Sequence, residues 1–541
     1  MKKQLKQIFK NKIYVITFLV IMLVAYGYFL FKPGTYIDDI AYSHYVKDYF
    51  YLRQGRWGLW LVHKVMPIQY STLWIARWLG FIFQAVAVVA LNCLMLKATE
   101  KKPDFIDERM LFLADVVYVT YSLVNEILFF SSTYWLDVFG VILTFISVGL
   151  VLFSNKIRPV KWLLAAFLVS IAVSMFEANA GVFITTTVIM LLLKELSDDS
   201  NKFYKIIVDG AISVVVLGMA LVLRNLIGKG IASANGVTLD IMHKATWQSE
   251  GMAYMLRYGI GRMMAEIVVH NGVAASAYFP MLEIIVALAL IVFFLIRATA
   301  KKQGRQAFLW FMMLVAAMSL NFAVGEVSYN RANYFVYALV VTFSVLYAGT
   351  LVGQNGKAAW TSVAIVAMGL LIGAQTIDLV GWEIRNNRRW QYEKSVITSI
   401  GEDLKSWDID NKPVIFTGTY TLPANLTKPT HVTWYSRRDM IFKKIFEATP
   451  PEFYYEEDLQ DQIGYKVNET GTNSIINWGM GLNFDETGAE LRDLLSMQGY
   501  QIMGSTEEQW SRAIWDCKVM DVWPNEGGIA DTGEYIIVNL Q

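Results

Sequence analysis

Cysteine, histidine and charge are all scarce in this chain. Its two cysteines, Cys93 and Cys517, stand far apart among 541 residues, so they predict neither a disulfide framework nor a metal cluster. None of the five histidines lies in an HExxH motif or a paired metal-ligand spacing, which argues against a zinc site built by the protein. Charged residues make up only 17% and nearly cancel to a net charge of +1, so no nucleic-acid partner is expected.

Apolar residues, by contrast, make up 55% of the chain, and they are unevenly distributed. Residues 1–381 form a series of long apolar runs in which Lys and Arg outnumber Asp and Glu by 32 to 21. Residues 382–541 have the composition of a soluble domain, with 15 basic against 25 acidic side chains. The sequence therefore predicts two domains, a transmembrane domain at 1–381 and a soluble extracytoplasmic domain at 382–541.

A membrane-spanning helix needs about 20 apolar residues. Eleven runs approach this length, near residues 13–31, 72–96, 110–129, 135–154, 161–176, 178–194, 206–227, 277–297, 308–324, 334–352 and 358–380. The first run lacks a small-residue cleavage site and is expected to remain as a signal anchor. The predicted fold class is a polytopic α-helical membrane protein of about eleven transmembrane helices, followed by a C-terminal α/β domain.

The loops between these runs differ in charge. Basic residues gather at the N-terminus and in residues 97–109, 155–161, 194–205 and 297–305. The alternate loops 125–134 and 177–181 contain no Lys or Arg, and 325–333 contains only Arg331. The positive-inside rule then places the N-terminus in the cytoplasm and the C-terminal domain outside a cytoplasmic membrane, which the chain crosses many times.

Ionisable residues in or beside the spans are expensive and usually functional. Those predicted near the outer face are Asp38, Asp39, Arg77, Glu126, Asp137, Glu177, Arg224, Glu283, Glu326, Arg331 and Asp378. Near the cytoplasmic face, the clear examples within spans are Asp115 and Asp209. A transporter would more often carry such groups at mid-membrane. The pattern favours a polar cavity that opens outward.

The Asp38-Asp39 pair directly follows the first span. Adjacent residues of a helix point about 100° apart, so the two carboxylates are expected to play different roles. One would act as general base toward an acceptor hydroxyl, while the other would orient a substrate or ligate a cation. The alternative is that the two acids cap a following helix.

Three further groups of residues are candidates for substrate binding. In Gly55-Arg56-Trp57, Arg56 would bind a phosphate or a sugar and Trp57 would stack on apolar surface. The alternative is an interface turn with a snorkelling Arg and an aromatic anchor. Arg77 would also offset phosphate charge. In the outer turn 326–331, Arg331 would bind phosphate while Glu326 and Asn330 bind sugar, or Glu326 and Arg331 form an ion pair. The remaining sugar or acceptor candidates are Glu126, Glu177 and Asn179. The alternative for Glu177 and Asn179 is a structural hydrogen bond between helices, and the alternative for Glu126 is a place in an aromatic belt.

The signal anchor, the Asp38-Asp39 pair, the following Gly55-Arg56-Trp57 and about eleven spans resemble the Gtr-type glucosyltransferase II family. These are bacterial multi-span glycosyltransferases of the GT-C class that use lipid-linked sugars. Tyr36–Trp60 carries most of the resemblance, and the ending from Trp523-Pro524 to Leu540 adds to it. The resemblance assigns the essential acidic role to Asp38 and Asp39.

The resemblance implies transfer of a sugar, glucose by default, from an undecaprenyl-phosphate donor to a cell-surface polysaccharide. The implied partners are this donor, the polysaccharide acceptor and the lipid bilayer, with a prenyl-phosphate glycosyltransferase and a flippase that supply the donor. No cofactor is certain, and a divalent cation beside Asp38 and Asp39 is left open. The chain lacks a glycine-rich phosphate loop, so no nucleotide-sugar site is expected.

Two other functions remain as alternatives. The predicted outer loop 228–276 contains His243, Arg257, Arg262 and His270, which suits a polysaccharide polymerase or ligase. A lipid-glycan transporter or flippase would instead need a binding path open to both faces.

Overall fold

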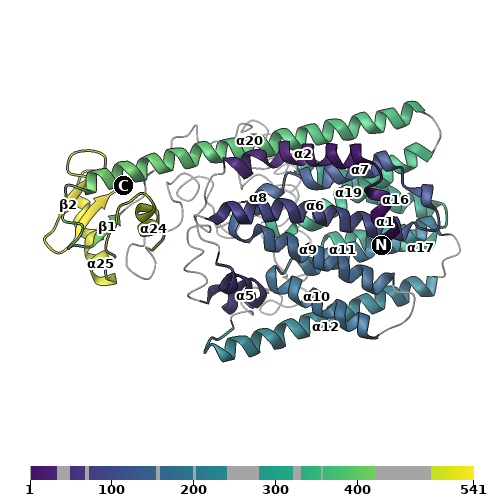
Figure 1. The fold of residues 1–541 in the computed structure, drawn as a ribbon, viewed down its shortest axis with the longest axis horizontal. Coiled ribbons are helices and arrows are strands. Elements are labelled where there is room, and N and C mark those ends of the chain that lie inside the picture. The colour runs from purple at the N-terminus through teal and green to yellow at the C-terminus, as the bar shows by residue number, and fades with distance from the viewer. Residues whose placement is uncertain are drawn as a thin grey trace, which may run out of the picture. The chain divides into compact units, whose positions relative to one another are not determined.

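A computed structural model describes residues 2–32, 49–67, 72–128, 130–153, 159–198, 203–239, 280–320, 330–354, 358–417, 420 and 489–540. The chain divides into two compact units (Figure 1). The helical unit comprises Met1–Phe31 and Tyr45–Trp382, and the C-terminal unit comprises Lys32–His44 and Glu383–Gln541.

The helical unit consists of long helices that coincide with the apolar runs and of shorter helices between them. In chain order they are α1 (Lys2–Ile8), α2 (Lys12–Phe31), α4 (Phe50–Arg53), α5 (Trp57–Val65), α6 (Leu73–Ala98), η2 (Pro103–Phe105), α7 (Glu108–Thr120), α8 (Val124–Leu128), α9 (Ser131–Leu152), α10 (Pro159–Met175), α11 (Asn179–Ser197), α12 (Phe203–Ala234), α16 (Pro280–Ala300), α17 (Gly304–Ala317) and α19 (Asn330–Gln354). The long helix α20 (Ala358–Leu404) begins in this unit and ends in the other.

Eight helices of the described residues are long and apolar enough to cross a membrane: α2, α6, α9, α11, α12, α16, α19 and the first part of α20. They confirm a polytopic helical membrane protein. The other three predicted spans coincide with shorter helices, α7 with 13 residues, α10 with 17 and α17 with 14. The count of eleven therefore stays a prediction. The break expected near residues 177–181 is present, because α10 ends at Met175 and α11 begins at Asn179.

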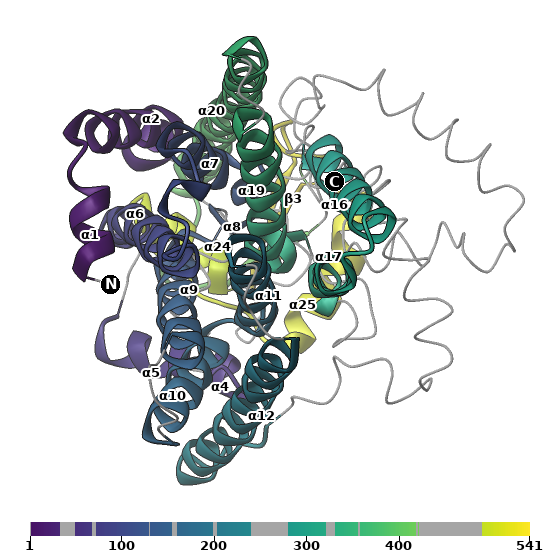
Figure 2. The same cartoon turned by 90° about the vertical axis from the view of Figure 1, so that its right-hand side faces the viewer.

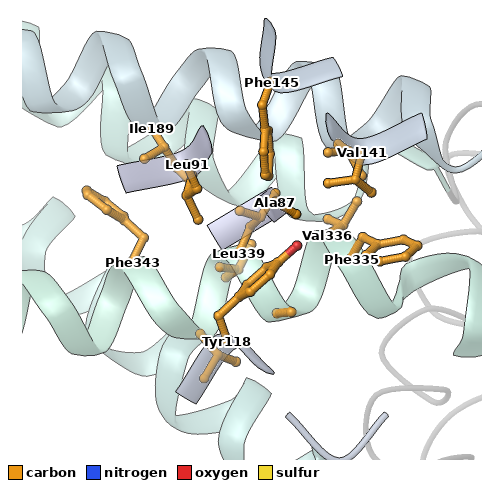
Figure 3. Packing of buried hydrophobic residues seen from close by; sticks show 14 of the residues in the cluster. Ala87, Leu91, Tyr118, Val141, Phe145, Ile189, Phe335, Val336, Leu339 and Phe343 are labelled. Atoms are coloured by element: carbon orange, nitrogen blue, oxygen red, sulfur yellow. The ribbon is translucent and has the colours of Figure 1, made fainter. Parts of the chain in front are cut away.

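The centre of the helical unit is formed by α9, α11 and α19. In these helices 72%, 78% and 78% of the span residues are buried, against 22% in α12 and in α20. Seen along the bundle, α9 and α11 lie in the middle, and α12 and α20 lie at opposite edges (Figure 2). Leu91 of α6, Tyr118 of α7, Phe145 of α9, Ile189 of α11 and Leu339 of α19 meet in this core (Figure 3).

One glycine allows a close approach beside this core. A Cβ at Gly140 of α9 would lie 2.4 Å from Nδ2 of Asn179 on α11. Small residues at such contacts let helices pack closely, which matters in lipid because apolar surface alone drives little association there. The start of α11 is thus held against α9 at the same end of the bundle as the turn that contains Glu177.

The described strands belong to the C-terminal unit. They are β1 (Val414–Thr417), β2 (Ile529–Asp531) and β3 (Ile536–Asn539), in the order β1-β3-β2, with β1 parallel and β2 antiparallel to β3. The helices α24 (Ala489–Met497) and α25 (Glu507–Asp516) accompany them, followed by η7 (Cys517–Val519). Thr506 and Gln509 form a capping box that begins α25. Strands β1 and β3 are buried along their whole length, as a small hydrophobic core requires.

Candidate functional site

Three charged side chains from distant segments meet at one end of the helical unit. Glu177 lies in the turn between α10 and α11, Arg56 directly precedes α5, and Arg224 lies in α12. Arg56 Nε donates to the two carboxylate oxygens of Glu177 at 3.1 and 3.0 Å, and Arg56 Nη2 lies 2.9 Å from Oε2. Arg224 Nη2 donates to Oε1 at 3.0 Å. These three residues are the arginine–glutamate cluster.

The Gly55-Arg56-Trp57 motif builds one side of this cluster. Gly55 follows α4 with φ 74°, a left-handed conformation that glycine adopts without the steric cost of a Cβ. The backbone N–H of Arg56 then donates to the Tyr51 carbonyl at 2.9 Å. Trp57 is 6% exposed, and its Nε1 donates to the carbonyl oxygen of Arg224 at 3.1 Å. Arg56 is thus paired within the protein, and Trp57 fixes the backbone of the second arginine.

The three side chains sum to a charge of +1, and a second carboxylate, Asp137 of α9, lies nearby. Burial lowers the pKa of Arg56, but Glu177 together with Asp137 raises it above its ordinary value. Burial raises the pKa of Glu177, but Arg56 and Arg224 outweigh it and lower the pKa to about 2, so this carboxylate is ionised at neutral pH. The side chains of Arg56 and Arg224 are 17% and 9% exposed, whereas Glu177 is 34% exposed. Arg224 Nε is buried without a hydrogen-bond partner among the described residues. Two guanidinium groups, one of which has an unused N–H donor, are suited to binding an anion such as a phosphate.

The helix α5 is fixed to the bundle by His63, which is fully buried. Its ring stacks on Tyr51 at 6.2 Å and meets the edge of Trp135 of α9 at 6.4 Å. Burial lowers the pKa of His63 to about 3, so the imidazole is neutral at pH 7. This histidine therefore holds α5, and with it Arg56, in place without adding charge.

Arg77, also predicted to bind phosphate, has other partners. It lies in α6 and is 6% exposed. Its Nε donates to Ser131 Oγ at the start of α9 at 3.2 Å, and its guanidinium lies 5.6 Å from the centre of the Phe29 ring. Its role toward a phosphate stays a prediction.

Asn179, predicted to bind a sugar or acceptor, is fully buried. Its Nδ2 donates to the Ala172 carbonyl of α10 at 3.0 Å and lies against Gly140 of α9. The residue thus connects three helices beside the cluster, and its sugar-binding role stays a prediction.

The other predicted site residues are not described in the same detail. Asp38, Asp39 and Glu326 lie outside the described residues. The backbones of Glu126 in α8 and of Asn330 and Arg331 at the start of α19 are helical, and their side chains lie outside the described part of the chain.

Two features of this end of the bundle were not assigned to the site from the sequence. One is Arg224, which the sequence placed among the ionisable residues near the outer face without a substrate role. The other is a polar network that joins α7, α20 and α16: Thr120 Oγ1 donates to Gln375 Oε1 at 2.6 Å, and Gln375 Nε2 donates to Glu283 Oε2 at 3.0 Å. The one ionisable group in these two hydrogen bonds is the Glu283 carboxyl, whereas the arginine–glutamate cluster contains two guanidinium groups.

Within the described ranges, no group of three or more His, Cys, Asp and Glu side chains is placed to hold a metal ion. Asp38 and Asp39, the pair considered for a divalent cation, lie outside these ranges. A cation beside them stays an open prediction.

The comparisons with known proteins agree with the layout of the helical unit. The family described as Glucosyl transferase GtrII matches residues 27–372, which is more than half of the chain and includes all three residues of the arginine–glutamate cluster. No curated protein and no solved structure matches. The resemblance seen in the sequence is thereby confirmed, and the chain belongs to the GtrII glucosyl transferase family.

Proposed function

We propose that the protein transfers a sugar, glucose by default, from an undecaprenyl-phosphate donor to a cell-surface polysaccharide, on the outer face of a bacterial cytoplasmic membrane. The arginine–glutamate cluster carries this proposal. Its residues come from the first outer loop, from the turn at residue 177 and from the outer end of the span 206–227, three places that the charge pattern predicts on the same side. Family membership supports the glycosyltransferase activity.

The cluster would act on the phosphate of the donor. Breaking the bond between the anomeric carbon and the phosphate oxygen leaves a prenyl phosphate with additional negative charge. Arg56 and Arg224, whose side chains are 17% and 9% exposed, would offset this charge. Arg77 and Arg331 are further candidates for this role. Glu177 keeps the two guanidinium groups of Arg56 and Arg224 close together, which their mutual repulsion would otherwise oppose.

The acceptor hydroxyl is activated by Asp38 or Asp39, which takes its proton. The hydroxyl oxygen then forms a bond to the anomeric carbon while the bond to the phosphate oxygen breaks, and the electron pair leaves with the prenyl phosphate. A single displacement of this kind inverts the anomeric configuration. The sugar or acceptor would contact residues drawn from Trp57, Glu126, Glu177, Asn179, Glu326 and Asn330, and the C-terminal unit would position the polymer.

A transfer assay tests the proposal. The purified protein receives a short-chain polyprenyl phosphate carrying radiolabelled glucose, together with envelope polysaccharide from cells that lack the gene. The label is expected to enter the polymer, with release of prenyl phosphate, and labelled UDP-glucose is expected to give none. Transfer from UDP-glucose alone would contradict the donor assignment. Movement of the labelled lipid across vesicles without transfer would favour a flippase.

The side on which the C-terminal unit lies can be tested by labelling. Val519 is 93% exposed, so Val519→Cys in a chain carrying Cys93→Ala and Cys517→Ser offers an accessible thiol. It is expected to react with an impermeant maleimide in intact spheroplasts. Lys302→Cys, in the exposed loop between α16 and α17, should react only after permeabilisation. The reverse pattern would place the unit in the cytoplasm.

A further inference from the structure

A polar cavity lies at the end of the helical unit opposite the arginine–glutamate cluster. Its volume is about 210 Å³. It lies among the C-terminal ends of α11, α16 and α19, the start of α17, and the loop that contains η2, all of which the sequence predicts at the cytoplasmic face. The described residues that line it are Lys102, Phe105, Leu196, Phe294, Arg297, Ala298, Lys301, Gln303, Gln306, Trp310, Tyr347, Leu351 and Gln354.

The charged lining of this cavity has one sign. Lys102, Arg297 and Lys301 contribute three cations, and no carboxylate is among the described lining residues. Glu195, the chain neighbour of the lining residue Leu196, is 3% exposed and forms an ion pair with Arg305 at 3.0 Å. Its charge is therefore already balanced by a cation outside the cavity lining. The three lining glutamines, Gln303, Gln306 and Gln354, add N–H donors.

Three aromatic side chains in the lining pack against one another. The ring of Phe294 lies 4.9 Å from Trp310 and 4.8 Å from Tyr347, and Trp310 lies 5.2 Å from Tyr347. Gln354 Nε2 donates to the Phe105 carbonyl at 3.2 Å, which ties the end of α19 to η2. Three interlocked aromatic side chains lose little conformational freedom when a ligand binds, so the cavity is preorganised.

We propose that this cavity binds the phosphate of an anionic phospholipid headgroup. Arg297 in the last turn of α16 and Lys301 just after its end would bind the phosphate oxygens, and Lys102 would add charge from the loop that contains η2. The acyl chains would continue along the apolar surface of α16. Phe293 and Ile296, which are 55% and 62% exposed on this helix, supply that surface. The inference is independent of the sugar-transfer proposal.

The positive-inside rule accounts for basic residues in this loop, but it does not require them to surround a cavity. Lys302 shows the difference. It lies in the same loop and is exposed, yet it does not line the cavity. Lys301 lines the cavity, and its neighbour Lys302 contributes only to the positive charge of the loop. Lys302→Gln therefore serves as the matched control.

Binding can be measured without any enzymatic assay. The full-length protein in an uncharged detergent is titrated with short-chain phosphatidylglycerol and followed by calorimetry. Saturable binding is expected for the wild type, with the affinity lowered about 30-fold in the double variant Arg297→Gln, Lys301→Gln and unchanged in Lys302→Gln. Thermal unfolding reports whether the double variant is folded; if it is not, Lys102→Gln alone is expected to weaken binding measurably.

Three results would overturn the inference. The first is equal affinity of wild type and folded cavity variants. The second is equal binding of short-chain phosphatidylcholine, which would show that net headgroup charge is not recognised. The third is equally tight binding of soluble glycerol phosphate, which would identify a free phosphate compound in place of a lipid as the ligand.

Discussion

Replacing Arg56 by glutamine is expected to lower the rate of sugar transfer by about 100- to 1,000-fold. The variant keeps a polar side chain but removes the guanidinium that binds both oxygens of Glu177 and provides one of the cluster's two cations. In the proposed reaction, the missing guanidinium would have stabilised the negative charge that develops on the departing prenyl phosphate. The turnover number should therefore fall more than KM for the donor rises. Steady-state kinetics with varied donor concentration separates the two.

A matched substitution distinguishes this effect from general destabilisation. Arg305 Nε lies 3.0 Å from Glu195, which is about 24 Å along α11 from Asn179, the first residue after the turn that contains Glu177. Arg305→Gln breaks a comparable ion pair and should leave transfer nearly unchanged. Arg56→Lys, which keeps the charge but loses the planar fork of donors, should be intermediate. Equal activity of wild type and a folded Arg56→Gln protein would remove the cluster from the mechanism.

Hydropathy was enough to locate most helices of the helical unit. The span expected from residue 72 is α6, which begins at Leu73, and the span expected from residue 178 is α11, which begins at Asn179. Helix ends were less predictable, because an apolar run and a helix need not end together. Past the predicted end at residue 227, α12 continues to Ala234 through Gly228 and Lys229. The run 110–129 is divided between α7 and α8 at Tyr121, where no glycine or proline marks a break.

The partners within the site could not be read from local sequence. Arg56 and Glu177 are separated by 121 residues, and Arg224 and Glu177 by 47. Periodicity reports the face of a helix on which a residue lies, not the distant residue that it meets. The cost of placing charge in a membrane did indicate that each of the three is functional or paired. Assigning them to one cluster required the packing of α10, α11 and α12 and the turn before α5.

Replacing Asp38 and Asp39 singly by asparagine is expected to have unequal effects. Adjacent side chains point about 100° apart on a helix and to opposite faces of a strand, so a single acceptor hydroxyl can meet only one of them well. The variant that lacks the general base should lose about 100- to 10,000-fold in transfer rate. Its remaining activity should also lack the fall toward low pH that protonation of a catalytic carboxylate produces. Single-turnover assays across a pH series measure both properties.

The alternative, in which the two acids only cap a helix, makes a different prediction. Glu507 and Glu508 are exposed acids in the first turn of α25, so Glu507→Gln and Glu508→Gln show what the loss of a structural acid does. Such losses should cost only about 0.3–1 kcal/mol of stability and leave transfer unchanged. If Asp38→Asn and Asp39→Asn behave like these two variants, neither aspartate is the base. The proton of the acceptor must then pass to a group other than Glu177, because a carboxylate with a pKa of about 2 between two arginines is too weak a base for that role.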